Sequence, residues 1–347
     1  MGAAIVFWPA HGKEVSAMLG YIGRRILLMI PMIFAISIVS FVIIQLPPGD
    51  YLTTVVAQLS AQGDVVDQAQ LAALKAQYGL DQPMIVQYWT WISRIVMDGD
   101  FGQSFIWNKP VSELLAGKVP LSAMLTISAL LVTWVVAFPI GVYSAVRQYS
   151  VGDYVATTIG FLGIAIPEFL IALILMWVSL TYFGQSVGGL LSPEYRDSNW
   201  NLGKLLDLLG HLWVPILVLG AAGTAGLIRV LRANLLDELH KPYVIAARAR
   251  GMRERRLTVK YPLRVALIPF FSTVGWILPG LVSGEVIVAQ VLSLDTAGPL
   301  LLNALKAQDM YLAGSIVLIV SVLTVIGTLI SDILLAWLDP RVRLRYR

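Results

Sequence analysis

The sequence predicts an all-α polytopic membrane protein with six transmembrane helices. Its 347 residues are 57% hydrophobic and only 13% charged, and the mean hydropathy is +0.76. Soluble domains are roughly half apolar, even with glycine counted, and about 25% charged. Six apolar segments reach the length of about 20 residues that a helix needs to cross a bilayer. The 29 Gly, 17 Pro and 10 Trp are also typical of membrane helices and their interfaces.

The six segments are residues 26–46, 121–146, 154–183, 211–231, 265–291 and 313–338. Arg24 and Arg25 precede the first one, as in a signal peptide. Its apolar run is too long for one, however, and the Pro-Pro-Gly-Asp sequence that follows is no cleavage site. The third segment is long enough to tilt, and Pro167 inside it predicts a kink. Residues 1–17 are expected to be dispensable, because Met18 lies at the usual distance before the arginines.

The Lys and Arg residues are distributed unevenly between the loops. Residues 229–264 carry ten of them against three acids, and the tail 339–347 carries four against one. The long segment 47–120 has only four against seven acids. Basic residues are retained in the cytoplasm. Both termini and the 229–264 loop are therefore predicted to be cytoplasmic, and segment 47–120 extracytoplasmic.

The predicted outer segment carries two runs of apolar residues at helical spacing, separated by Asp81 and Pro83. The runs are Leu71, Leu74 and Tyr78, then Ile85, Tyr88, Trp89, Ile92 and Ile95. We expect two short amphipathic helices, with Trp89, Trp91 and Trp107 at the membrane surface. Two roles stay open for this segment: packing on the protein's own outer face, or receiving a partner.

No sequence signature of a catalytic or cofactor site is present. The phosphate loop G-x-x-x-x-G-K-[ST] is missing, as are G-x-G-x-x-G, G-x-S-x-G and H-E-x-x-H. The three His are isolated, and the absence of Cys excludes disulfides, thiolate metal sites and Cys nucleophiles. A net charge of +4 is too small to indicate a nucleic-acid partner. We expect neither an enzyme nor a bound cofactor.

Three acids lie within the apolar segments: Glu168, Glu285 and Asp332. An unpaired charge in the membrane is costly, so such acids are candidates for function. For Asp332, two turns from the tail, a hydrogen-bonded position facing other helices is favoured. Glu285 follows a small-xxx-small face that ends at Gly284, which permits close helix approach. For Glu168 and Glu285, lining of a polar pathway and a purely structural role both stay open.

The most informative stretch is Lys241-Pro-Tyr-Val-Ile-Ala-Ala-Arg-Ala-Arg-Gly-Met-Arg-Glu-Arg-Arg256. Helical periodicity places Val244, Ile245, Ala249 and Met252 on one face, with Arg250 and Glu254 opposite at i,i+4 spacing. Gly251 is expected to end the helix at its C′ position. So short a helix needs a surface to pack on. That surface is either a docked partner or the lipid headgroups.

This stretch resembles the cytoplasmic EAA loop, here about residues 237–262, of importer permeases in the ABC superfamily. Tyr243-Val-x-x-Ala-Arg-Ala-Arg-Gly and the later Arg264-x-Ala-Leu-Ile-Pro fit the dipeptide/oligopeptide/nickel branch. Ordered matches also occur at Arg24-Arg-Ile, Leu46-Pro-Pro-Gly-Asp, Tyr78-Gly-Leu-Asp-Gln-Pro, Gly99-Asp-Phe-Gly-Gln-Ser and Leu338-Asp-Pro-Arg. Two positions depart from the branch: Ile245 replaces the acid that names the loop, and residues 292–298 read Leu-Ser-Leu-Asp-Thr-Ala-Gly. The second departure leaves oligosaccharides and other solutes open beside peptides.

The resemblance implies a type I ABC importer fold in the bacterial inner membrane. Residues 18–46 would form the first transmembrane helix and 121–338 a five-helix transmembrane domain, with 339–347 as a tail. The implied partners are a second permease, two ATP-binding subunits that hold ATP and Mg²⁺, and an extracytoplasmic solute-binding protein. The residues implied in ATPase docking are Tyr243, Ala246, Ala247, Arg248, Ala249, Arg250 and Gly251. The alternatives are an ATP-independent secondary transporter or channel, and a membrane-assembly factor; the sequence shows no internal repeat of the kind typical of secondary transporters.

Overall fold

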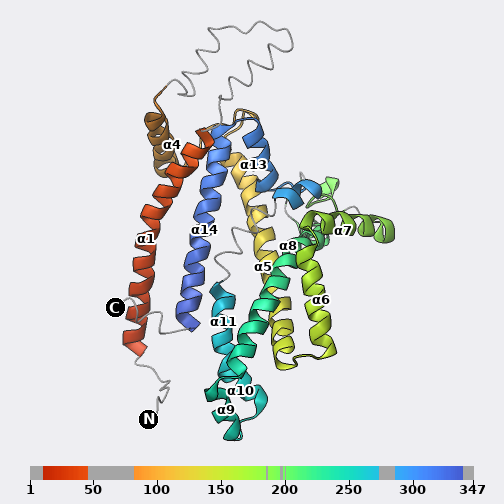
Figure 1. Ribbon diagram of the computed structural model, residues 1–347. Helices are drawn as coiled ribbons and strands as arrows, with labels where there is room; N and C mark the ends of the chain where they lie inside the picture. Colours follow the sequence, from red (N-terminus) through yellow and green to blue (C-terminus); the bar gives the residue numbers. More distant parts are fainter. Residues whose placement is uncertain are drawn as a thin grey trace, which may run out of the picture.

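The computed structural model describes residues 11–45, 82–184, 187–195, 198–199, 201–272 and 286–338, and these are overwhelmingly helical. In Figure 1 the long helices α1, α5, α8 and α14 run along the length of the molecule. The elements are α1 (His11–Gln45), α4 (Met84–Asp98), α5 (Val111–Val146), α6 (Val151–Ala165), α7 (Glu168–Phe183), the 3-10 turn η1 (Pro193–Tyr195), α8 (Leu202–Leu239), α9 (Pro242–Ala249), α10 (Glu254–Lys260), α11 (Pro262–Ser272), α13 (Ala297–Lys306) and α14 (Met310–Leu338).

The described helices confirm an all-helical polytopic membrane protein. Residues 20–42 of α1, all of α5 and α8, and residues 310–336 of α14 are long and apolar enough to span a membrane. They contain most of the first predicted segment, all of the second and fourth, and nearly all of the sixth. The fifth, 265–291, starts within α11 and is helical again at 286–291, but residues 273–285 lie outside the described residues. Helix α5 begins ten residues before the second predicted segment, so part of the predicted outer segment belongs to this helix.

The third predicted segment is not the single kinked span that we expected. It is two helices, α6 and α7, whose axes differ by 104° (Figure 1). Pro167 disfavours helical geometry in the residue before it, and Ile166 is extended, with φ −88° and ψ 125°. The helix therefore ends at Ala165, and Pro167 becomes the N-cap of α7. Proline here separates two helices instead of bending one.

The predicted outer segment contains α4, which confirms the second of its two expected helices. The first falls outside the described residues. Tyr88 and Trp91 are buried and pack with Phe41 of α1 and Leu318 of α14. Trp107 also packs inward, beside a cluster that α5, α13 and α14 share, whereas Trp89 is exposed. Trp91 therefore packs against the protein itself, and Trp107 does so in part.

A buried carboxylate forms hydrogen bonds that link residues 104–105 to the start of α14. Asp309 immediately precedes α14 and is fully buried. It accepts hydrogen bonds from the Ser104 hydroxyl at 2.6 Å and the Phe105 backbone N–H at 2.8 Å. It also accepts from the backbone N–H of Leu312 at 3.2 Å, as a helix-capping side chain does. Neutral donors from residues 104–105 and from Leu312 partly offset the desolvation of this acid.

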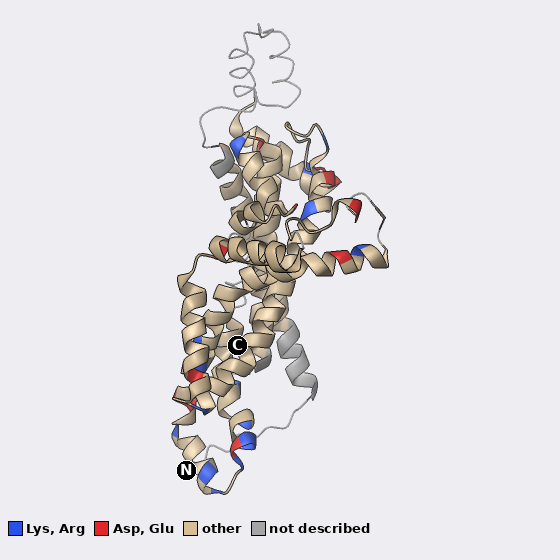
Figure 2. Cartoon of the chain, turned by 90° about the vertical axis from the view of Figure 1, so that its right-hand side faces the viewer, with Lys and Arg blue, Asp and Glu red and all other residues tan. Residues whose placement is uncertain are grey.

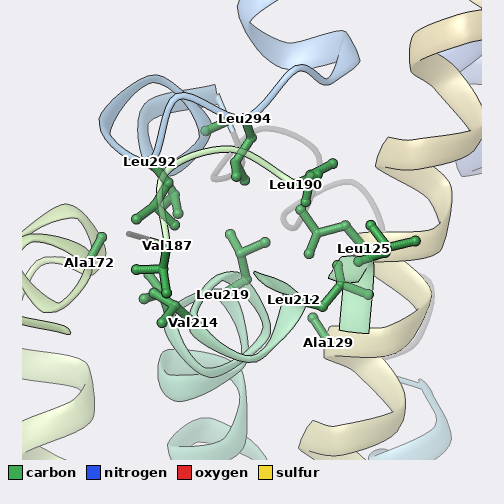
Figure 3. Packing of buried hydrophobic residues seen from close by; sticks show 14 residues of the cluster. Leu125, Ala129, Ala172, Val187, Leu190, Leu212, Val214, Leu219, Leu292 and Leu294 are labelled. Carbon is green, nitrogen blue, oxygen red and sulfur yellow. The ribbon is translucent and has the colours of Figure 1, made fainter. Parts of the chain in front are cut away.

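Apolar clusters fill the bundle at three levels. In the central one, α5, α7 and α8 meet the segments 187–190 and 288–294 around Leu219 (Figure 3). A second cluster joins α5, α8 and α11, and a third joins α5, α13 and α14. Helices α5 and α8 approach closely because small residues face them: a Cβ added to Gly141 would lie 3.1 Å from Leu231. The loop of residues 240–261 follows the end of α8.

Candidate functional site

Helix α9 lies between α8 and α10 at one end of the molecule (Figure 1). Figure 2 shows Lys and Arg gathered at this end. The helix starts at Pro242, whose fixed φ and missing N–H suit the first helical position. Lys241 precedes it in an extended conformation, so the chain leaves α8 and re-enters a helix within three residues.

The C-terminus of α9 is a Schellman motif. Gly251 has φ +78°, in the left-handed region that favours glycine. Its N–H donates to the Arg248 carbonyl at 3.0 Å, and the Met252 N–H donates to the Ala247 carbonyl at 3.3 Å. These are the 5→2 and 6→1 bonds of the motif. The expected role of Gly251 as the C′ residue is thus confirmed.

Two anchors hold α9 against the protein. Val244 is completely buried, and the Tyr243 hydroxyl donates to the Glu238 carboxylate of α8 at 2.5 Å. Partial burial and the bond to Glu238 raise the pKa of Tyr243, so its hydroxyl stays protonated as the donor. On the other side, Leu257 of α10 is also completely buried. The short helix is therefore fixed at its start and just beyond its end.

The remaining surface of α9 is open. Ala246, Arg248, Ala249, Arg250 and Gly251 are exposed, as is Tyr243 in part, and Ala247 is half-buried. These are the seven residues implied in docking, and six of them are exposed. The expected apolar face is wrong, however, because Val244 is buried whereas Ile245 is 55% exposed. Of the four residues of that expected face, Val244 is the one that is fully buried.

The expected i,i+4 relation of Arg250 with Glu254 is replaced by another pair. The Arg248 guanidinium binds the Glu254 carboxylate with two bonds, Nε to Oε1 at 2.5 Å and Nη2 to Oε2 at 3.1 Å. The Gly251 turn interrupts the helix, so helical spacing does not apply across it. The pair lowers the pKa of Glu254, which stays ionised and joins the end of α9 to the first turn of α10.

The base beneath α9 is apolar and well packed. Leu231 and Leu235 near the end of α8 contact α11 through Leu263 and Phe270, all of them buried. Because α8 precedes α9 and α11 follows α10, the loop is held at both ends by helices that pack on each other. Both ends of the loop that contains α9 are therefore connected to helices that pack on each other.

Two of the three acids of the apolar segments lie within the described residues, on different helices. Asp332 of α14 pairs with Arg25 of α1, with 3.0 Å between Nη1 and Oδ2, which confirms its expected position facing another helix. Glu168 is half-buried at the start of α7, away from α9 (Figure 1). Glu285 lies outside the described residues. Among the residues that the structure describes, no three His, Asp or Glu side chains lie close enough to hold a metal ion.

Comparison with known proteins places this architecture in one family. Residues 137–344 match the family described as binding-protein-dependent transport system inner membrane component, and residues 18–126 match its N-terminal companion. The chain is 36% identical to the oligopeptide transport system permease protein AppB of Bacillus subtilis, over 94% of this chain and 99% of that one. It is 31% identical to the glutathione transport system permease protein GsiC of Salmonella typhimurium, with the same coverage. It is 30% identical to the peptidoglycan transport system permease protein YejB of Agrobacterium fabrum, over 93% and 97%.

The chain belongs to this permease family. It is a multi-pass inner-membrane permease component of a binding-protein-dependent importer, a transport subunit and not a catalytic enzyme. Permeases of this family act with ATP-binding and substrate-binding partners. The absence of a phosphate loop from the sequence is consistent with ATP binding by a separate subunit.

One prominent feature of the permease was not predicted. Asp153, in the first turn of α6, is buried and forms an ion pair with Arg232 of α8. The sequence Ser150-Val-Gly-Asp153 has the spacing of a capping box, so the helix start was readable. The partner is 79 residues away, and nothing in the local sequence indicates it.

Proposed function

We propose that α9 is the element through which this permease docks on an ATP-hydrolysing subunit. The observation that carries the proposal is an exposed helix whose base is fixed. Ala246, Ala249 and Gly251 present little bulk, so that a partner can approach the backbone closely. Arg248 and Arg250 provide charge beside them. The buried Val244 and the Tyr243–Glu238 bond prevent the helix from lifting away under load.

The proposed assembly has the type I importer arrangement with six transmembrane helices. The EAA loop and both termini face the cytoplasm, which the ten basic residues of 229–264 support. A second, similar permease completes the pathway, and two ATP-binding subunits bind beneath it. A solute-binding protein delivers its load to the outer segment, 47–120. ATP hydrolysis belongs to the partner chains, whose closure moves the permease helices as rigid bodies.

The proposed solute is oligopeptide-like or oligosaccharide-like. The relatives named for oligopeptide, glutathione and peptidoglycan transport support a peptide-containing solute. The 292–298 segment departs from the usual sequence of the peptide-transporting branch. For this reason the proposed solute classes include oligosaccharides as well as peptides. We also propose Glu168 and Glu285 as polar residues of the pathway; the half-buried position of Glu168 beside a helix break supports its part. Ligand identification on the cognate binding protein tests the solute class.

Co-purification of the permease with its ATPase tests the docking role. The tagged wild-type chain, expressed with its operon neighbours at native level, should recover a Walker-type ATPase. Ala246→Glu places a charge and bulk on the exposed face and should release that ATPase while the permease stays inserted. Thr90→Glu makes the same addition on an exposed position of α4 and should retain it.

Two outcomes would overturn the proposal. If the wild type recovers no ATPase although transport is active, the chain works as an ATP-independent transporter or channel. If Ala246→Glu keeps both the ATPase and full transport, α9 is not the docking element.

A further inference from the structure

A buried ion pair joins α6 to the lower part of α8. Asp153 is 2% exposed, and the Arg232 guanidinium donates to both of its carboxylate oxygens. The distances are 2.8 Å from Nε to Oδ1 and 2.8 Å from Nη2 to Oδ2. Such a two-bond arrangement fixes orientation as well as distance, because both N–H groups of the planar fork must face the carboxylate.

The same carboxylate organises the turn between α5 and α6. Its Oδ2 accepts the Tyr149 backbone N–H at 3.0 Å, and the Asp153 N–H in turn donates to the Ser150 hydroxyl at 3.2 Å. Tyr149 adopts φ +63°, which a non-glycine residue holds only where the surroundings enforce it. Asp153 is therefore bound both to its own turn and to α8, so the turn cannot move relative to α8 without breaking the pair.

Further along α6, its contact with α8 is formed by small residues. Gly160 and Gly163 face Ala221 and Ala225, and a Cβ added to either glycine would meet these residues only at 3.6 Å or beyond. Such small residues let the two helices approach closely, but they contribute no charged side chain that would fix their relative position. Among the described residues, no second ion pair connects the two helices. The Asp153–Arg232 pair is thus the charged contact that fixes the two helices relative to each other.

The position of the pair relates it to α9. Arg232 lies two turns before the end of α8, and α9 begins three residues after that end. Leu231 and Leu235 pack on the side of α8 that faces α5 and α11. Helix α6 ends at the break before α7. A displacement of α9 that shifts the end of α8 is therefore transmitted directly to Asp153, and through α6 to the α6–α7 break.

We propose that Arg232 and Asp153 are a positioning pair that makes α6 follow α8 when the docked ATPase displaces α9. The inference rests on the docking role proposed above. Neither residue needs to contact solute. Lysine cannot replace Arg232, because a single ammonium does not hold the carboxylate in two directions.

Distance measurements in the assembled importer test the pair without knowledge of the solute. The chain has no cysteine, so single cysteines can be introduced for spin labels. One pair of labels, on the exposed positions Val155 of α6 and Ala233 of α8, reports whether the helices move together. A second pair, on Arg253 and Thr90, reports whether nucleotide displaces the α9 region relative to the outer end. Each pair is measured without nucleotide and with ATP and vanadate.

In the wild type, ATP should change the Arg253–Thr90 distance and leave the Val155–Ala233 distance unchanged. In Asp153→Asn, the Val155–Ala233 distribution should shift with ATP, on the order of one helical turn or about 5 Å. Arg232→Lys should give an intermediate shift, and Asp153→Glu, which keeps the charge pair, should restore much of the wild-type behaviour. In proteoliposomes carrying the solute of the cognate binding protein, Asp153→Asn should hydrolyse ATP but transport at least tenfold less solute per ATP.

Asp332→Asn is the matched control, because it breaks another interhelical ion pair, with Arg25, that does not involve α6 or α8. It should lower the thermal stability without changing the Val155–Ala233 response. The proposal is overturned if Asp153→Asn and Arg232→Lys both keep a fixed Val155–Ala233 distance, or if Asp332→Asn changes it equally. If the Arg253–Thr90 distance in the wild type does not change with ATP, this result would instead refute the proposed docking role of α9.

Discussion

The conformation of Gly251 permits a quantitative test of how α9 is held together. At φ +78°, an L-residue with a Cβ is strained by about 1 kcal/mol relative to glycine. A Cβ added at this position meets no atom within 4 Å, so backbone strain is the whole cost and no clash contributes. Gly251→Ala should therefore destabilise the closed turn by about 1 kcal/mol, which corresponds to a roughly fivefold larger open population. Gly251→Asn should cost much less, because asparagine tolerates this region.

Hydrogen–deuterium exchange of the purified permease in lipid nanodiscs measures this population. The amides to follow are those of residues 251 and 252, which make the two bonds of the Schellman motif. Their exchange reports local opening and not global unfolding. Gly251→Ala should speed it about fivefold, whereas Gly251→Asn should stay within about twofold of the wild type. The global melting temperature should not change with either.

Gly226→Ala provides the control for the substitution itself. Gly226 is inside α8, where a Cβ meets open space and alanine is the better helix former. Exchange at residues 251 and 252 should be the same as in the wild type. Equal acceleration by Gly251→Ala and Gly251→Asn, or none by either, would refute the assignment of strain to the left-handed backbone.

Three further predictions concern other parts of the permease. Gly141→Val should lower stability by about 1–3 kcal/mol in thermal unfolding, because the side chain overlaps Leu231, while Gly226→Val in open space should cost less. Asp309→Asn should lower the melting temperature, since an amide cannot accept every bond that the carboxylate accepts. Burial raises the pKa of Asp309 above 3.8, so the native state holds its proton more tightly than the unfolded one. The melting temperature of the wild type relative to Asp309→Asn should therefore fall as the pH rises above about 4; a rising difference would contradict it. Deletion of residues 1–17 should leave insertion and transport intact, and loss of the protein from the membrane would show the reverse.

The features that the sequence predicted well depend on local chemistry. The long helices follow from apolar length, and the end of α9 follows from a single residue, because glycine suits the left-handed C′ position. Predictions from helical spacing failed where the chain makes a turn. This spacing placed Arg250 beside Glu254, but the helix ends at the Gly251 turn, which brings Arg248 to Glu254 instead. Spacing rules hold only within one unbroken helix.

The features that were missed depend on which segments pack together. Pro167 marks where the third apolar segment breaks, but the angle of 104° is set elsewhere. Helix α7 is directed by its packing, with Ala172 in the central cluster beside α8 (Figure 3). Similarly, the Ser104 and Phe105 donors to Asp309 come from more than 200 residues earlier in the chain. No periodicity carries that information, because it arises only once the helices have assembled.

The basic residues of 229–264 show how one sequence signal covers two physical roles. The proposed retention of this loop in the cytoplasm depends on the number of positive charges, to which arginine and lysine contribute equally. Arg232 differs from the other basic residues of this loop. Its guanidinium binds the buried Asp153 carboxylate with two hydrogen bonds and joins α6 to α8. Exposed members such as Arg255 have no such geometric demand. The number of positive charges therefore supports the proposed orientation of the loop. The two-bond geometry of the Arg232 guanidinium, in contrast, is what we propose makes α6 move together with α8.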